Sequence, residues 1–224
     1  MANSTDFSHT AHLFQKKLRS AERHLRSQRD PLAEWIRVHG KCTLEIAWDR
    51  ELFEALVRAI AHQQLHGKAA QSILNRLIAE FPRKSFPTPR QLARAAPERL
   101  RSLGFSNAKV VAIQGIANAA LAGKVPTRAE ADTMSDEDLI GQLVNLRGVG
   151  RWTVEMLLIF TLGRLDVMPI DDFGVRSGLQ NLYGLSDLPK KAMFAELTEN
   201  WSPYRSIGAW YLWRYADAQR ESRK

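Results

Sequence analysis

Cysteine is nearly absent from this sequence: Cys42 is the single one among 224 residues. One thiol excludes an intramolecular disulfide framework and any cluster held by four cysteines, so a reduced cytoplasmic setting is the default expectation. Long hydrophobic runs are missing too, since no stretch approaches the roughly 20 apolar residues that a membrane-spanning helix needs. The first residues, MANSTDFSHT, lack the apolar core of a secretory signal. We therefore expect a cytosolic protein with no membrane partner.

Acidic residues are the scarcer charge. Against 32 Lys and Arg there are 24 Asp and Glu, which gives a formal net charge of +8 and a pI near 9.9. This balance favours a polyanionic partner such as nucleic acid, although solvated charge without a partner is common. A chain of this length can bury a substantial core, as one domain or as two small lobes.

Apolar residues recur at helical spacing along almost the whole chain. The pattern predicts helices over residues 10–27, 30–38, 49–63, 67–80, 88–94, 97–102, 106–122, 135–145, 151–162, 174–182, 190–200 and 204–219. Two starts carry capping signals, a capping box from Thr88 to Gln91 and a close variant in Ser135 and Asp138. Residues 42–48 alternate enough for a strand, but too little follows to build a sheet. The predicted fold class is all-α.

A tight turn with two glycines, Gly148-Val149-Gly150, separates two of these helices. The glycines allow positive φ and let another backbone approach closely. The free N–H groups at the start of the next helix form a ready anion site. Thr153 adds a hydroxyl to it, and Arg147 and Arg151 add charge. The turn is therefore a candidate phosphate-binding site, with an ordinary glycine-capped helix connection as the alternative.

Two adjacent carboxylates, Asp171 and Asp172, follow Pro169-Ile170 and precede a helical segment. Aspartate at a helix start caps backbone N–H groups and complements the helix dipole. One aspartate can serve in this way and leave its neighbour available. Capping also keeps a carboxylate ionised, the form that stabilises an oxocarbenium-like transition state. A structural cap and a catalytic pair both stay open at this point.

The order of these features is specific. The run LRGVGRWT (146–153), an apolar helix and the run PIDD (169–172) follow one another, with Asp172 twenty residues after Trp152. This arrangement resembles the helix-hairpin-helix DNA glycosylases, and within them it is most similar to the DNA-3-methyladenine glycosylase II type. Supporting matches lie in residues 58–70, 100–109 and 203–213, so the resemblance covers about residues 50 to 215 in matching order.

The resemblance implies two helical lobes around a DNA-binding cleft with a helix-hairpin-helix motif. We expect residues 1–50 to form an N-terminal helical segment that packs with the C-terminal lobe. Residues 51–165 would form the central lobe with the hairpin, and residues 166–224 the C-terminal lobe with the catalytic aspartate. The region before residue 50 is too short and too helical for the N-terminal β-sheet domain of the longer bacterial enzyme, so we expect that domain to be lacking.

Site residues carry over from the family by position. Asp172 matches the catalytic carboxylate, and Gly148 and Gly150 match the hairpin that grips a phosphate. Gln64 falls at the residue that wedges into the gap left by the flipped nucleotide. The neighbouring His66 is expected near the minor groove.

A monovalent cation, Na⁺ or K⁺, is also implied by the resemblance. In the family, carbonyl groups of the hairpin hold this ion, which bridges to a DNA phosphate. By position the carbonyls would belong to Val144, Leu146 and Val149. No cofactor is expected for the chemistry itself.

Two positions depart from the family's pattern. Trp152 stands where lyase-competent relatives carry a Schiff-base lysine, so no amine is positioned for covalent attack. Water is then the expected nucleophile and an abasic site the product. Met156 stands where the larger enzyme has an aromatic side chain, which implies an altered base pocket. Trp152 and Trp213 are the candidates for holding a cationic base, because tryptophan faces attract cations.

The resemblance implies a monofunctional glycosylase of base excision repair. It would hydrolyse the N-glycosidic bond of 3-methyladenine and related N-alkylpurines in double-stranded DNA, as a monomer. The alternatives are a glycosylase for another damaged or mismatched base, and a non-catalytic DNA-binding module. A metal-dependent enzyme that uses His62 and His66 is a further alternative, but no Glu lies between them and no third ligand is close in sequence.

Overall fold

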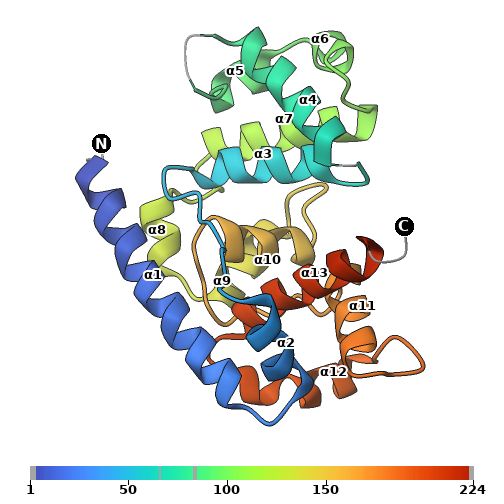
Figure 1. Cartoon of the computed structure of the whole chain (residues 1–224). Coiled ribbons are helices and arrows are strands. Elements are labelled where there is room, and N and C mark those ends of the chain that lie inside the picture. The colour runs from blue at the N-terminus through green and yellow to red at the C-terminus, as the bar shows by residue number, and fades with distance from the viewer. Residues whose placement is uncertain (1–3, 66, 83–84, 222–224) are drawn as a thin grey trace. The chain divides into compact units, whose positions relative to one another are not determined.

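The structure is a computed structural model that describes residues 4–65, 67–82 and 85–221 (Figure 1). Every regular element in these ranges is a helix, which confirms the all-α prediction. In chain order they are α1 (Ser4–Ser27), α2 (Pro31–His39), α3 (Leu52–His62), α4 (Gly67–Glu80), α5 (Pro89–Arg94), α6 (Pro97–Ser102), α7 (Asn107–Leu121), α8 (Arg128–Thr133), α9 (Asp136–Leu143), α10 (Arg151–Phe160), α11 (Phe173–Leu182), α12 (Lys191–Leu197), the 3₁₀ helix η1 (Glu199–Trp201) and α13 (Arg205–Glu221). None of these described helices has the length and hydropathy that a bilayer crossing requires.

The chain divides into two compact units. The first unit consists of Met1–Trp48 together with Leu158–Lys224, and the second is Asp49–Leu157. The N-terminal helices α1 and α2 therefore belong with α11, α12 and α13, and the division falls within α10.

In the first unit, α1, α2 and α11 all pack against α13. Gly178 of α11 lies directly on α13, because an added Cβ there would stand 2.5 Å from the carbonyl oxygen of Leu212. A larger residue would push the two helices apart, since close-packed interiors do not absorb extra volume cheaply. This tight pairing positions the site, because Asp172 begins α11 and Trp213 belongs to α13.

In the second unit, α3, α5 and α6 pack against α7. The predicted capping box at the start of α5 is confirmed, with Thr88 and Gln91 bonding each other's backbone N–H. A second capping box, Thr127 and Glu130, starts α8, a helix that the spacing of apolar residues did not predict. Its six residues are too few for periodicity to register, although the capping signal is present in the sequence.

Residues 42–48 run without forming a strand, so the expected alternation does not produce a ladder among the described residues. A strand needs a partner backbone, and here Ala47 instead donates to the carbonyl of Phe160 at the end of α10, at 3.0 Å. Cys42 lies in this segment, 6% exposed, and its backbone N–H donates to Glu22 Oε1 at 2.6 Å. Burial and the charge of Glu22 raise the pKa of the Cys42 thiol to about 12.

Candidate active site

Asp172 is the N-cap of α11. Its extended backbone, with φ −73° and ψ 124°, ends the preceding loop, and its Oδ1 accepts the N–H of Val175 at 2.8 Å. The half-buried carboxylate therefore sits where the positive end of a helix dipole favours negative charge. The residue expected to do the chemistry is thus also the residue that caps the helix.

Trp213 holds the same carboxylate from the opposite helix. Its indole Nε1 donates to Asp172 Oδ1 at 2.8 Å, and its ring packs at 5.5 Å against Phe160. Gly174 makes room for this contact, because an added Cβ would lie 3.0 Å from Trp213 Cδ1 and 3.1 Å from Asp172 Oδ1. The sequence predicts Trp213 as a wall of the base pocket. In the structure its indole N–H points at the carboxylate, and this bond together with the one from Val175 N fixes the orientation of the Asp172 carboxylate.

Asp171 has a different environment. It is exposed, and it forms an ion pair with Lys191 Nζ at 3.0 Å. Exposed pairs of this kind contribute little stability. The two adjacent aspartates are therefore clearly distinguished, one on the surface and one held between α11 and α13.

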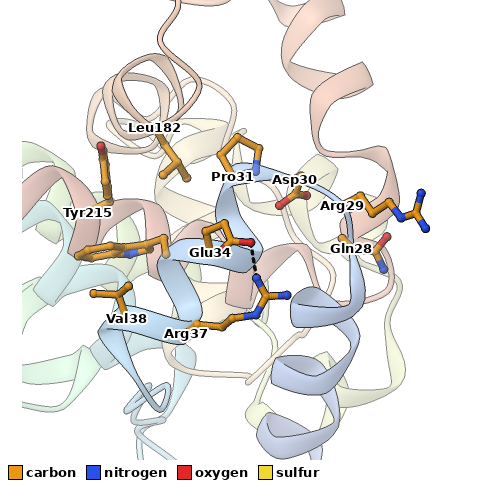
Figure 2. A pocket seen from close by; sticks show the side chains of 10 residues that line it. Gln28, Arg29, Asp30, Pro31, Glu34, Arg37, Val38, Leu182 and Tyr215 are labelled. Carbon is orange, nitrogen blue, oxygen red and sulfur yellow. Dashed lines mark hydrogen bonds and ion pairs between the residues drawn. The ribbon is translucent and has the colours of Figure 1, made fainter.

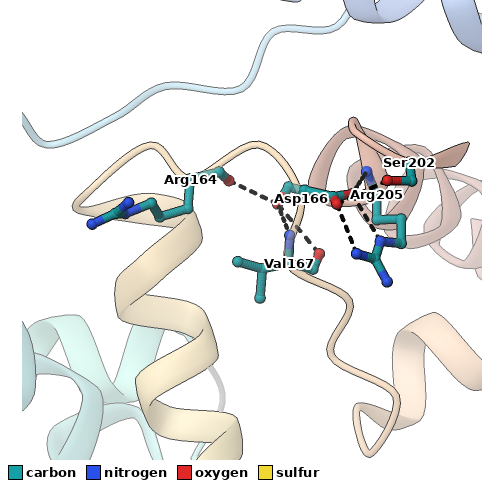
Figure 3. A network of polar contacts seen from close by, with 6 residues as sticks. Arg164, Asp166, Val167, Ser202 and Arg205 are labelled. Carbon is teal, nitrogen blue, oxygen red and sulfur yellow. Dashed lines mark hydrogen bonds and ion pairs between the residues drawn. The ribbon is translucent and has the colours of Figure 1, made fainter. Parts of the chain in front are cut away.

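A network of polar contacts anchors the loop that leads to Asp172 (Figure 3). Asp166 accepts from Arg205 Nε and Nη2, both at 2.7 Å, and from Ser202 Oγ at 3.0 Å. The buried Ser206 hydroxyl donates to the carbonyl of Arg164 at 2.7 Å and accepts from the N–H of Val167 at 2.9 Å. These contacts tie the loop to the first turn of α13. They are the reason why a loop residue and a helix residue 41 positions apart can meet at one carboxylate oxygen.

Burial opposes ionisation of Asp166, but the bonds from Arg205 and Ser202 outweigh it and lower the pKa of this carboxyl below its ordinary value. The group is therefore held in its charged form in the folded protein. It stabilises the anchored loop only while it stays ionised.

The hairpin lies in the second unit between α9 and α10. Gly148 has φ +83°, a conformation that other residues rarely adopt, and an added Cβ would meet Ala112 Cβ at 3.0 Å. Val149 is buried, while Gly148 and Gly150 are exposed. The turn thus has the backbone exposure that a phosphate would require.

Gln63 braces the hairpin from the end of α3. Its Nε2 donates to the carbonyl of Gly148 at 3.0 Å and to Thr153 Oγ1 at 3.4 Å. Thr153 is only 2% exposed, so its hydroxyl serves this contact inside the unit. Lys109 Nζ in turn donates to the carbonyls of Ala61 and Gln63, both at 2.8 Å.

Gln64, the expected wedge, follows directly. It is exposed and has φ +56°, the one positive φ of a non-glycine residue among those described. Such a conformation costs about 1–2 kcal/mol, and strain of this kind concentrates at functional positions. His66, two positions on, lies outside the described residues.

Besides Thr153, the helix α10 carries three predicted site residues. Arg151 is engaged by two carboxylates: its guanidinium bonds both oxygens of Glu137, and its Nε donates to Glu155 Oε1 at 3.1 Å. Trp152 is 37% exposed, and Met156 is half-buried one turn further on. The charge of Arg151 is therefore paired with carboxylates of the protein itself, which the sequence alone did not suggest.

The carbonyl groups of Val144, Leu146 and Val149 surround the same turn. Leu146 O accepts the N–H of Val149 at 3.0 Å. The carbonyls of Val144 and Val149 accept no hydrogen bond from any described residue. Hard oxygen donors without partners suit a monovalent cation, so these residues fit the ion that the resemblance implies. No group of three or more His, Cys, Asp or Glu suited to a metal occurs among the described residues. The metalloenzyme alternative stays a hypothesis, because it uses His66, which lies outside those residues.

A separate pocket of about 770 Å³ lies in the first unit, between the α1–α2 turn, α2, Leu182 and Tyr215 (Figure 2). Tyr215 and Trp213 are two positions apart on α13, roughly 200° around the helix, so the pocket lies on a different side of α13 from Asp172. Its rim carries charges of both signs, with Glu34 and Arg37 paired to each other. Mixed charge of this kind does not favour a polyanion.

Several functional contacts were not predicted from the sequence. In the sequence, Gln63 and Lys109 are only parts of the matching segments, and no motif includes Asp166. Each acts through a partner at least 39 positions away, as Asp166 does through Arg205. No local pattern signals such a contact.

Known proteins resemble this chain closely. The family model described as HhH-GPD superfamily base excision DNA repair protein matches residues 57–203. DNA-3-methyladenine glycosylase 1 of Schizosaccharomyces pombe is 44% identical over 165 residues, which cover 74% of this chain and 72% of the relative. Alkylbase DNA glycosidase-like protein mag2 of the same yeast is 38% identical over 202 residues, 90% of this chain and 95% of the relative. A solved structure of S. pombe 3-methyladenine DNA glycosylase (Mag1) in complex with abasic DNA matches with a TM-score of 0.80 at 40% identity, covering 87% of this chain and 95% of that one.

Proposed function

Since this chain belongs to the HhH-GPD superfamily of base excision DNA repair proteins, we propose that Asp172 carries its chemistry. The protein is a monofunctional DNA-3-methyladenine glycosylase, and it hydrolyses the N-glycosidic bond of an alkylated base to leave an abasic site. The substrate in this proposal is double-stranded DNA that contains 3-methyladenine or related N-alkylpurines, bound by a monomer. The observation that supports Asp172 is its fixed carboxylate, which accepts from both Val175 N and Trp213 Nε1.

The reaction begins with exposure of the damaged nucleotide. A base inside a duplex shields its glycosidic bond, so the nucleotide must be turned out at a cost of a few kcal/mol. Gln64, exposed on its left-handed loop, fills the gap in the stack in this proposal. The hairpin at Gly148 and Gly150 holds the strand by its phosphate.

The leaving group is already activated. Alkylation at a ring nitrogen makes the base cationic, and the face of Trp152 attracts such a ring by roughly 0.5–2 kcal/mol. As the bond to the base lengthens, positive charge develops on the deoxyribose. The negative Asp172 carboxylate stabilises that charge and orients the attacking water. Because position 152 is a tryptophan rather than a lysine, no amine forms a Schiff base with the sugar.

A monovalent cation belongs to the DNA grip in this proposal. The carbonyls of Val144, Leu146 and Val149 would hold it beside the hairpin, where it would add positive charge next to a phosphate. It takes no part in bond cleavage.

The test is the release of bases from methylated DNA by the wild type and by Asp172→Asn. Asparagine caps helices as well as aspartate does, and its Oδ1 can accept both hydrogen bonds, so the fold is kept while the charge is lost. Base release should fall on the order of 10²-fold or more, measured by chromatography of the freed bases. Asp171→Asn is the matched control and should retain activity, because Asp171 pairs with Lys191 on the surface. Unchanged release by Asp172→Asn would overturn the assignment.

A further inference from the structure

A groove of about 780 Å³ opens in the second unit beside the hairpin, between the end of α7, the end of α9 and residues 145–147. The charged residues that line it are Lys124 and Arg147, and the neutral polar ones are Asn118, Gln142 and Asn145. None of the lining residues is acidic. The groove therefore has a single sign of charge, unlike the pocket beside α2.

The two cations are available to a ligand. Lys124 and Arg147 are exposed, and neither side chain makes an ion pair or hydrogen bond with a described residue. The backbone of Lys124 is nevertheless fixed, because its N–H donates to the carbonyl of Ala119 at 2.8 Å and its own carbonyl accepts from Gln142 Nε2 at 3.0 Å. Arg151, on the other side of the turn, is neutralised by Glu137 and Glu155. The unpaired positive charge next to the hairpin thus lies on the Arg147 side.

Gly115 gives a second observation at the groove. It is exposed in the middle of α7, where glycine is less favourable than alanine. No described atom lies within 4 Å of where its Cβ would be, so packing within the protein does not require glycine there. This wall of the groove therefore has free space beside it, which a ligand or a long side chain can enter.

We propose that this groove binds a second phosphate of the DNA backbone, next to the phosphate held by the hairpin, with Lys124 and Arg147 as its charged ligands. Asn118 supplies a neutral donor at the same place. The groove shares Leu146 and Arg147 with the hairpin, so the two phosphate sites are continuous on one surface. The inference rests on the proposed function, because it assumes that the hairpin holds DNA.

The experiment measures the salt dependence of binding. Fluorescent duplex DNA with an abasic-site analogue is titrated with the Asp172→Asn protein, alone and combined with Lys124→Gln plus Arg147→Gln. Each neutralised phosphate contributes about 0.9 to the slope of log K against log salt, so losing this one phosphate in the double variant should lower the magnitude of the slope by about 0.9. Arg90→Gln, an exposed cation of the same unit outside the groove, should leave the slope unchanged. An unaltered slope in the double variant would overturn the proposal.

A steric probe uses Gly115. Gly115→Ala should bind DNA like the parent, since its Cβ meets nothing nearby, whereas Gly115→Glu places a carboxylate in the groove and should weaken binding at least tenfold. Equal binding by these two variants would contradict a phosphate there. Thermal melting of each variant shows that the fold is retained.

Failure of this inference is distinguishable from failure of the proposed function. The slope is measured on the Asp172→Asn protein, so it depends on DNA binding and not on base release. If the wild type binds DNA but frees no base, the glycosylase mechanism is rejected. The salt slope then still tests whether the groove binds a phosphate.

Discussion

Asp172 combines a structural task and a chemical one in a single side chain. The sequence left open that one aspartate of the pair caps the helix while the other is available, but the cap and the candidate catalyst are the same residue. A group that caps a helix is held in one orientation before substrate arrives. Orientation fixed in advance is what makes charge effective in a transition state.

Trp213 should act as the positioning partner of that carboxylate. Trp213→Phe keeps a ring against Phe160 but removes the N–H that donates to Asp172 Oδ1 at 2.8 Å. The loss of one hydrogen bond to a charged group is worth roughly 1.5–3 kcal/mol, so base release should slow by about tenfold or more. The single-turnover rate of Trp213→Phe should fall, while the substrate concentration that gives half-saturation should stay at the parent value.

Trp210→Phe makes the same chemical change on the same helix. No hydrogen bond from its indole N–H to Asp172 exists, and its ring packs on Tyr211 and His39. It should release bases at close to the parent rate. If both tryptophan variants slow equally, the hydrogen bond at Asp172 has no special role.

The loop after α3 stores backbone strain where the wedge is expected. Gln63 and Lys109 fix its first residues, and Gln64 is held at φ +56°. Over-determined loops of this kind keep a side chain in an unfavourable conformation because the surrounding contacts leave it no alternative.

Gln64→Gly and Gln64→Ala separate strain from function. Glycine tolerates this φ, so Gln64→Gly should be more stable than Gln64→Ala by about 1 kcal/mol. Both variants lose the wedge and should process lesions in duplex DNA more slowly, while a single-stranded substrate should be affected less. The measurements are thermal melting and base release from the two substrates. Equal melting of the two variants would show that the loop relaxes without strain.

Low pH should destabilise the fold by protonating Asp166, the carboxylate that anchors the loop before Asp172. The pKa of this carboxyl is depressed, so its stabilising effect is complete above the ordinary value of 3.8 and is lost as the pH falls through the lower folded value. The wild type should therefore lose melting temperature steeply below about pH 4. The melting temperature of Asp166→Asn should be lower than that of the wild type at neutral pH and should fall less in acid. The melting temperatures of the two proteins should therefore converge at low pH. Parallel curves over the whole range would contradict the role of this ion pair.

Much of the architecture could be predicted from the sequence because its signals are local. A few neighbouring residues are enough to recognise each of them: the capping box at Thr88, the glycines of the hairpin and the aspartate at a helix start. The strand expected over residues 42–48 fails because alternation does not supply a partner backbone. The missed helix α8 had its signal in Thr127 and Glu130, which spacing of apolar residues does not detect.

The contacts that orient the site were beyond prediction for a physical reason. The bond from Trp213 to Asp172 and that from Arg205 to Asp166 join residues about 40 positions apart. They depend on how α11 and the preceding loop pack against α13, which no short pattern specifies. The engagement of Arg151 by Glu137 spans only 14 positions, but it too depends on how the hairpin folds and has no local signal.

The burial of Cys42 should protect the protein from modification by alkylating agents. Agents that methylate DNA bases also attack thiolates, and reactivity follows the ionised fraction and exposure of the sulfur. With a pKa of about 12 and 6% exposure, the only thiol of this chain presents almost no nucleophile to such agents. The protein is thereby shielded, at that atom, from the reagents that create the substrates proposed for it.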